Sequence, residues 1–90
     1  MTKVDDNQRK QELITRLNRI EGQVRGIKQM INDDRYCDDI LIQISAIINS
    51  LKSFGNNILK DYLSTTVVDD LKNGKLETIE EIVTLFGRIN

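Results

Sequence analysis

The residue types that carry most enzyme and metal chemistry are scarce in this sequence. Its 90 residues include one cysteine, Cys37, and no histidine. Histidine is the commonest general base and the commonest metal ligand, so its absence excludes serine–histidine and cysteine–histidine catalysis. A single cysteine also excludes an intrachain disulfide. We therefore expect a protein that is not an enzyme and that has no disulfide framework.

Cys37 is the one residue suited to thiol or soft-metal chemistry. It is expected in the first turn of a helix, where backbone amides favour the thiolate and the neighbouring Asp38 and Asp39 oppose it. A sensor thiol and a soft metal ligand are the functional interpretations, and a small buried hydrophobic residue is the structural alternative. A soft-metal site takes about two to four Cys or His ligands. The residues alone therefore predict no metal site and no cofactor.

Basic residues are concentrated in the first third of the chain. Residues 1–30 carry seven basic and four acidic residues, whereas residues 31–90 carry six basic and ten acidic residues. Such a distribution is typical of a polyanion-binding face, although an ordinary solvated helix surface has the same composition. Four polar residues, spaced by 7, 3 and 4, share one side of the first predicted helix: Arg9, Arg16, Arg19 and Gln23. Because arginine binds phosphate oxygens, and arginine and glutamine bind base edges, this side is the candidate DNA-binding face.

The spacing of the apolar residues predicts the helices that position these side chains. The first helix, at about residues 6–33, has apolar residues at steps of 4, 3, 4, 3 and 4: Leu13, Leu17, Ile20, Val24, Ile27 and Ile31. The second helix, at about 35–71, repeats these steps: Ile40, Ile44, Ile47, Leu51, Phe54 and Ile58. A third helix, at about 76–89, follows the turn signal Asn73-Gly74. The pattern predicts one all-α domain over residues 1–90.

The second predicted helix is apolar on two sides. A further stripe adds to the first one: Leu41, Ile48, Leu59 and Leu63. The first helix can cover one side, but covering the other takes more protein than a chain of this length supplies. We therefore expect the second helix to pair with its copy in another subunit, which makes an antiparallel four-helix bundle from two hairpins.

The end of the second helix, between residues 63 and 71, is expected to be weak. Thr65–Val68 are four consecutive β-branched residues, which lower the helix propensity. Asp69 and Asp70 then place carboxylates near the C-terminal end of the helix, where the helix dipole disfavours them. We therefore expect the helix to weaken or end in this segment.

The sequence gives no sign of a membrane segment. No apolar run approaches the roughly 18 residues of a membrane span. The first six residues lack the charged and then apolar order of a signal peptide. We therefore expect a cytoplasmic protein with no membrane partner.

Two segments of the sequence are close to a family signature. They are Arg16–Ile27 (RLNRIEGQVRGI) and Tyr36–Ala46 (YCDDILIQISA). Together they resemble the CsoR/RcnR/FrmR family of bacterial repressors, whose members respond to copper(I), to nickel or cobalt, to formaldehyde or to reactive sulfur. The resemblance implies a three-helix protomer, a four-helix-bundle dimer and a tetramer that is a dimer of dimers. It also implies DNA binding without a helix-turn-helix.

The resemblance assigns the DNA contacts residue by residue. The promoter-binding arginine of the family falls on Arg16, and Arg19 is a neighbouring support. A second basic contact used by some members falls on Ser53, so Lys52 is the adjacent basic residue. With the helical face described above, the predicted residues that bind double-stranded operator DNA are Arg16, Arg19, Arg9, Gln23 and Lys52.

The resemblance also implies a sensing site. Copper-sensing relatives use a cysteine that matches Cys37, together with a histidine and a cysteine of the partner subunit that fall on Tyr62 and Thr66. Neither tyrosine nor threonine is a strong copper(I) ligand. A tyrosine and a glutamate that support the metal site in copper sensors are present as Tyr36 and Glu81. The sensing site therefore matches the family in part, and Cys37 is its one candidate soft ligand.

The predicted function is a DNA-binding transcriptional repressor that an unidentified inducer, acting near Cys37, releases from its operator. The second cysteine of persulfide-sensing relatives and the N-terminal proline of formaldehyde-sensing relatives are also absent. Oxidation or alkylation of Cys37 is therefore the predicted switch. Two alternatives stay open: a helical oligomeric interaction module that has lost inducer sensing, and a degenerate copper(I) sensor. The expected partners are operator DNA and further copies of the chain, as a homodimer or homotetramer.

Overall fold

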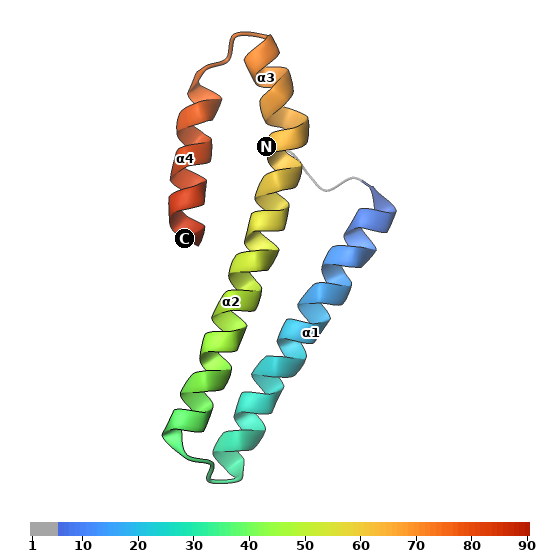
Figure 1. Ribbon diagram of the computed structural model, residues 1–90. Helices are drawn as coiled ribbons and strands as arrows, with labels where there is room; N and C mark the ends of the chain where they lie inside the picture. The colour runs from blue at the N-terminus through green and yellow to red at the C-terminus, as the bar shows by residue number, and fades with distance from the viewer. Residues whose placement is uncertain (1–5) are drawn as a thin grey trace. The chain divides into compact units, whose positions relative to one another are not determined.

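Residues 6–90 are described by the computed structural model, and every regular element in that range is a helix (Figure 1). The elements are α1 (Asn7–Asn32), α2 (Cys37–Tyr62), the π-helix η1 (Leu63–Val67), α3 (Val68–Lys72) and α4 (Glu77–Ile89). Because α2, η1 and α3 follow one another without a break, the chain forms three helical stretches. The predicted all-α class with three helices is confirmed. Residues 1–5 of the predicted domain lie outside the described residues.

The described residues divide into two compact units, with the boundary inside α2. Residues 6–51 form a hairpin from α1 and the first part of α2, and residues 52–90 form another from the rest of α2, η1, α3 and α4. The single domain over residues 1–90 stays a prediction, and so does the four-helix bundle. Within residues 6–90, no helix is both long and apolar enough to cross a membrane.

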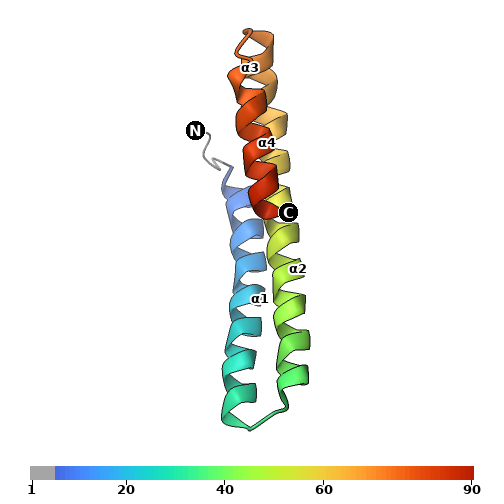
Figure 2. The ribbon, with the colours of Figure 1, turned by 90° about the vertical axis from the view of Figure 1, so that its left-hand side faces the viewer.

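In the first hairpin, α1 runs antiparallel beside the first part of α2 (Figures 1 and 2). The helix begins after Asp6, whose Oδ1 accepts a hydrogen bond from the Gln8 amide at 2.9 Å. It ends at Asn32, and the Asp33 amide donates to the Gln29 carbonyl at 2.9 Å. Asp34 then takes a φ of 56°. Aspartate adopts this left-handed conformation more readily than most residues, so the chain can reverse into α2 here.

The packed face of α1 follows regular steps of three and four residues. Leu13 and Ile20 are buried, with exposed fractions of 5% and 9%. Half-buried side chains continue the same line along the helix: Arg9, Arg16, Gln23, Ile27 and Met30. The predicted apolar stripe of α1 is therefore divided, because Leu17, Val24 and Ile31 lie on its other edge and are exposed. These three side chains are available to a further packing partner.

The first part of α2 shows the same division. Ile47 is buried, with an exposed fraction of 7%. Four other apolar side chains, at steps of 3, 4 and 3, are exposed: Leu41, Ile44, Ile48 and Leu51. A helix with two apolar sides needs cover on both, and in this hairpin one of the two sides is open.

In the second hairpin, α4 runs antiparallel beside the end of α2, η1 and α3 (Figures 1 and 2). Leu59 and Val67 are its buried apolar residues. The two helices approach closely at Gly55, where an added Cβ would lie 3.3 Å from Ile89 Cδ1. The turn that leads into α4 contains Gly74 with a φ of 77°, a conformation that glycine adopts without steric cost.

The segment predicted to be weak contains the π-helix η1. The backbone stays helical at both of its ends, with right-handed helical dihedral angles at Tyr62 and Val68. The Asp61 carbonyl accepts two side-chain hydrogen bonds, from Ser64 Oγ at 3.1 Å and from Thr65 Oγ1 at 2.8 Å. Single π turns inside α-helices frequently occur at functional sites. This turn directly follows Tyr62, one of the predicted sensing residues.

Candidate DNA-binding face and sensing groove

The predicted DNA-binding residues of α1 lie along one border of its packed face. Arg9, Arg16 and Gln23 are half-buried on the line of the buried apolar side chains, and Arg19 is exposed. We call these four residues the basic edge. The Arg9 guanidinium also forms an ion pair with Glu12, with 3.2 Å between Nη1 and Oε2. An arginine can pack its apolar stem against the protein while its guanidinium reaches the surface, and such a guanidinium suits bidentate phosphate contacts.

Gln23 differs from the three arginines of the basic edge. Its Oε1 is inaccessible to solvent and has no hydrogen-bond partner among the residues that the structure describes. An amide oxygen buried in this way costs about 1–3 kcal/mol. For Gln23 to bind a base edge, its amide must first rotate out of the packed face.

Lys52, the remaining predicted DNA contact, belongs to the second hairpin. Its side chain is exposed on α2, as is that of the neighbouring Ser53. The Ser53 carbonyl accepts a hydrogen bond from Asn57 Nδ2 at 2.9 Å. Lys52 is therefore accessible to a phosphate group.

Cys37 is the first residue of α2, and its thiol is free and exposed. Tyr36, which precedes it, has 80% of its surface exposed. Arg35 and Asp39 form an ion pair around this helix start, with 3.4 Å between Nη2 and Oδ2. Exposed pairs of this kind contribute at most about 1 kcal/mol. The structural alternative of a buried cysteine is therefore wrong for the single chain, and small reagents can reach the thiol.

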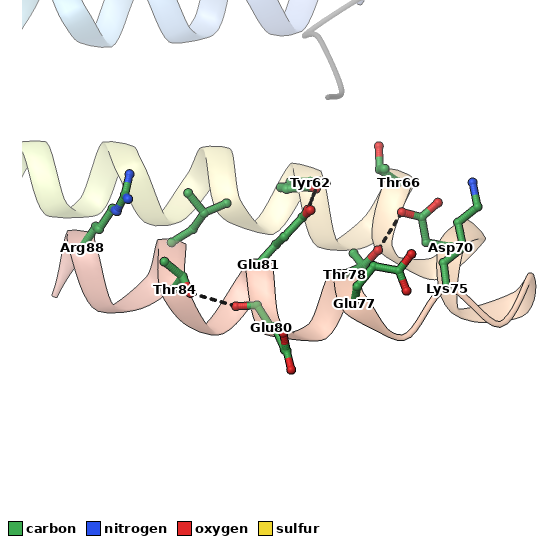
Figure 3. Close-up of a pocket in the computed structure, with 11 residues that line it drawn as sticks. Tyr62, Thr66, Asp70, Lys75, Glu77, Thr78, Glu80, Glu81, Thr84 and Arg88 are labelled. Carbon is green, nitrogen blue, oxygen red and sulfur yellow. Dashed lines mark hydrogen bonds between the residues drawn. The ribbon is translucent and has the colours of Figure 1, made fainter.

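Tyr62 and Thr66 line an open groove of about 710 Å³ in the second hairpin (Figure 3). The lining comes from the end of α2, from η1, α3 and α4, and from the turn before α4: Tyr62, Thr66, Asp70, Lys75, Glu77, Thr78, Glu80, Glu81, Thr84, Leu85 and Arg88. The Tyr62 hydroxyl donates a hydrogen bond to Glu81 Oε2 at 3.3 Å. The groove thus brings together three of the predicted sensing residues, Tyr62, Thr66 and Glu81.

The surroundings of Tyr62 keep its phenol protonated. Partial burial raises the pKa of Tyr62 above its ordinary value of 10.0. The negative charge of Glu81 and the hydrogen bond to it raise this pKa further, and the charge of Asp70 adds to the effect. At neutral pH the side chain is therefore a neutral hydrogen-bond donor, as the bond to Glu81 requires.

A second polar pair in the groove was missed by the sequence analysis. Thr78 is the most buried polar residue described, with an exposed fraction of 3%. Its Oγ1 donates a hydrogen bond to Asp70 Oδ2 at 2.8 Å, which joins α4 to α3 (Figure 3). The two residues are eight positions apart, on either side of a turn, and no periodic pattern relates them.

The helical hairpins, the basic edge and the polar groove can be compared with known proteins. The family model described as "Metal-sensitive transcriptional repressor" matches residues 9–88. The chain belongs to this family. The predicted resemblance to CsoR/RcnR/FrmR repressors is thus confirmed, and so is the prediction that the chain is not an enzyme.

Two curated members of the family are similar over most of the chain. The copper-sensing transcriptional repressor CsoR of Bacillus subtilis (strain 168) is 44% identical over 80 residues, which are 88% of this chain and 79% of that protein. The copper-sensing transcriptional repressor RicR of Mycobacterium tuberculosis is 46% identical over 67 residues, 74% of this chain and 70% of that protein.

Two solved structures show the same fold. The copper-sensing repressor CsoR of Geobacillus thermodenitrificans NG80-2, crystallised with Cu(I), has a TM-score of 0.86 and 34% identity, and the match covers 97% of this chain and 92% of that one. The nickel-responsive regulator InrS has a TM-score of 0.76 and 28% identity, over 100% of this chain and 99% of that one. The chain therefore has a CsoR-like fold.

The donor groups of this repressor do not fit the copper(I) site that its relatives suggest. Copper(I) prefers thiolate, thioether and imidazole ligands, whereas the groove is lined by oxygen and nitrogen groups and by Leu85. Within residues 6–90 the only sulfur atoms are those of Cys37 and Met30. In the same range, no group of three or more His, Cys, Asp or Glu side chains is placed to hold a metal ion.

Proposed function

We propose that this chain is a cytoplasmic repressor that binds operator DNA as a tetramer and leaves it when an inducer acts near Cys37. The observation that carries the proposal is the basic edge of α1 in a chain of the repressor family. Arg16 and Arg19 are the principal phosphate contacts, and Arg9, Gln23 and Lys52 support them. One protomer offers few such contacts, so affinity depends on repeating them by symmetry.

The open apolar sides of the first hairpin support the assembly. Leu17, Val24 and Ile31 on α1, and four residues of α2 from Leu41 to Leu51, are exposed at regular helical steps. Contiguous apolar surface of this kind marks an interaction site. When the first hairpin of another copy of the chain packs antiparallel on this surface, the two hairpins form a four-helix bundle. Two such dimers give the tetramer.

The exposed thiol supports a switch based on Cys37. With hydrogen peroxide, the sulfur takes one oxygen as the O–O bond breaks, which gives a sulfenic acid and one molecule of water. With an alkylating electrophile, a new C–S bond forms, the leaving group departs with its electron pair, and the thiol proton passes to water. Either product changes the size and polarity of the start of α2. It releases DNA only if it favours the quaternary state that binds DNA less well.

Gel-shift titration with DNA from upstream of the protein's own gene tests the DNA-binding part. Arg16→Ala is expected to weaken binding by about 10-fold to 100-fold, since each lost phosphate or base contact costs about 1–3 kcal/mol. Arg25→Ala is the matched control, because Arg25 is exposed and only loosely paired with Glu21, at 3.9 Å. Equal loss in both variants, or no binding by the unaltered protein, would contradict the proposal.

Peroxide treatment tests the switch in the same assay. The unaltered protein is expected to release DNA after treatment, and Cys37→Ala is expected to stay bound. Equal responses of the two proteins would eliminate a switch based on Cys37.

The names of the two copper-sensing relatives described above favour a second candidate, a degenerate copper(I) sensor. In that case Cys37 binds copper(I) together with an external small thiol. Competition with a copper(I) chelator measures this directly. Binding that outcompetes the chelator and disappears in Cys37→Ala would favour this candidate. If the protein binds neither DNA nor copper(I), the result would favour the remaining alternative, an oligomeric interaction module.

A further inference from the structure

Residues 65–70 begin inside η1 and continue into α3, and they consist of three doubled residues, Thr65-Thr66, Val67-Val68 and Asp69-Asp70. In each pair, one member makes the contacts of the second hairpin. Thr66 lines the groove, Val67 is buried with an exposed fraction of 5%, and Asp70 binds Thr78. The other member of each pair is exposed.

The π turn holds one residue more than a regular helix needs. Leu59 and Val67 are both buried, although they are eight residues apart. In an α-helix, eight residues leave two side chains about 80° apart around the axis, whereas seven leave them about 20° apart. Because η1 accommodates the additional residue, Val67 takes the position that residue 66 would hold in an unbroken α-helix.

We propose that residues 65–72 have two registers and that η1 is the switch between them. In the second register, the π turn closes to a regular α-helix, and each residue of the segment takes the place of the one that follows it. Thr65 then replaces Thr66, Val67 replaces Val68, and Asp69 replaces Asp70 opposite Thr78. The additional residue passes into the turn before α4, where nothing lies within 4 Å of an added Cβ at Gly74.

The doubled sequence makes the two registers similar in free energy. Threonine and aspartate keep their places in the groove, and the hydrogen bond to Thr78 is kept with a new acceptor. Among the three places that make contacts, those of Thr66, Val67 and Asp70, the one unlike exchange puts Thr66 where Val67 is buried. The two side chains have nearly the same shape, and a threonine hydroxyl in a helix can bond to a carbonyl one turn earlier, as Thr65 does with Asp61.

The same shift is blocked in the preceding part of the helix. A one-residue movement of α2 would bring Phe54 to the place of Gly55, where an added Cβ is already 3.3 Å from Ile89. It would also bring Asp61 to the place of Tyr62 and remove the hydrogen bond to Glu81. The register change is therefore confined to the residues after Tyr62.

A segment with two registers gives the groove two discrete arrangements. Any ligand that binds one arrangement better than the other shifts the equilibrium between the two registers. This regulatory consequence rests on the proposed function, whereas the two registers do not. They are tested by thermal unfolding at a fixed protein concentration, which requires neither DNA nor an inducer. Failure of one proposal is thus distinguishable from failure of the other.

The experiment compares Asp69→Ala, Asp70→Ala and the double variant. With two registers, Asp70→Ala moves the segment to the register in which Asp69 binds Thr78. The unfolding midpoint of Asp70→Ala then falls by less than half as much as the midpoint of the double variant. The fall in the double variant also exceeds the sum of the falls in the two single variants. With one register, Asp70→Ala alone lowers the midpoint by the full amount, and the falls in the two single variants add up to the fall in the double variant. Additive losses would overturn the proposal.

A second comparison does not depend on the double variant being folded. Thr78→Val is introduced into the unaltered chain and into Asp70→Ala. With two registers, Thr78→Val lowers the midpoint in both backgrounds, because Asp69 has replaced Asp70 as its partner. With one register, it has no further effect once Asp70 is gone. That second result would also overturn the proposal.

Discussion

The hairpin of residues 6–51 and the hairpin of residues 52–90 pack their helices in different ways. In the first, the packed face of α1 follows unbroken steps of three and four residues, and polar side chains alternate with apolar ones along it: Arg9, Leu13, Arg16, Ile20, Gln23 and Ile27. In the second, the helix widens into the π turn η1, and hydrogen-bonded pairs join α4 to α2 and α3.

The difference indicates which task each hairpin suits. A regular helix holds arginine side chains at a constant spacing, as binding to a series of phosphates requires. A polar groove beside a π turn can exchange contacts with little loss of buried apolar area, as a sensing element requires. Substitutions on the open apolar sides of the first hairpin should therefore change assembly, and substitutions of the polar pairs in the second hairpin should change its local stability.

The largest expected effect comes from a charge on the open side of α2. Ile48→Asp places a carboxylate in the proposed subunit interface, and an unpaired buried charge costs several kcal/mol. We expect sedimentation to show a smaller species than the unaltered protein. Asn49→Asp, one position further and away from the steps of Leu41, Ile44 and Ile48, is the matched control. An unchanged assembly for Ile48→Asp would remove the proposed role of this side.

The second hairpin should lose stability when its most buried polar contact is removed. Thr78→Val keeps the shape of the side chain but deletes the 2.8 Å hydrogen bond to Asp70. Hydrogen bonds to charged groups contribute about 1.5–3 kcal/mol, and each 1 kcal/mol lowers the midpoint of a domain this size by roughly 4–8 °C. Thr84→Val is the control, because Thr84 Oγ1 bonds only to the Glu80 carbonyl of its own helix. Similar losses in the two variants would show that the contact between α3 and α4 is unimportant.

The first hairpin should gain stability when its unpaired oxygen is removed. Gln23→Leu replaces the amide whose Oε1 is buried without a partner. Removing that desolvated group is expected to stabilise the hairpin by about 1 kcal/mol, measured as a higher unfolding midpoint at the same protein concentration. Gln29→Leu serves as the control, since Gln29 is exposed and its Nε2 donates to Asp33. A lower midpoint for Gln23→Leu would show that the oxygen gains a donor in the assembled protein.

The two hairpins also differ in how far the sequence predicts them. The apolar steps from Leu13 to Ile31 are sufficient to predict the helix α1, but the residues on both edges of that apolar stripe have the same spacing. Nothing in it says which edge α2 covers. The positions of Tyr62 and Glu81 follow from the family resemblance, and the groove that joins them comes from the structure. The pair of Asp70 and Thr78 was not predictable, because it depends on the one additional residue in η1.

The smallest effect expected is a dependence of stability on pH at Tyr62. Its pKa is raised above 10.0 in the folded chain, first by partial burial and then by Glu81. The folded state therefore binds the phenol proton more tightly than the unfolded state does. This contribution to stability is fully present below the unfolded value of 10.0 and is lost as the pH rises through the higher folded pKa.

Tyr62→Phe removes the titrating group and its hydrogen bond to Glu81. We expect the urea midpoint of the unaltered protein to exceed that of the variant near pH 8, and the difference to shrink as the pH approaches about 11. Comparing the two proteins at each pH cancels the titration of the lysines, which they share. A difference that stays constant over this range would mean that Tyr62 supports the second hairpin by its ring alone. The contrast between the two hairpins would then be weaker at this residue.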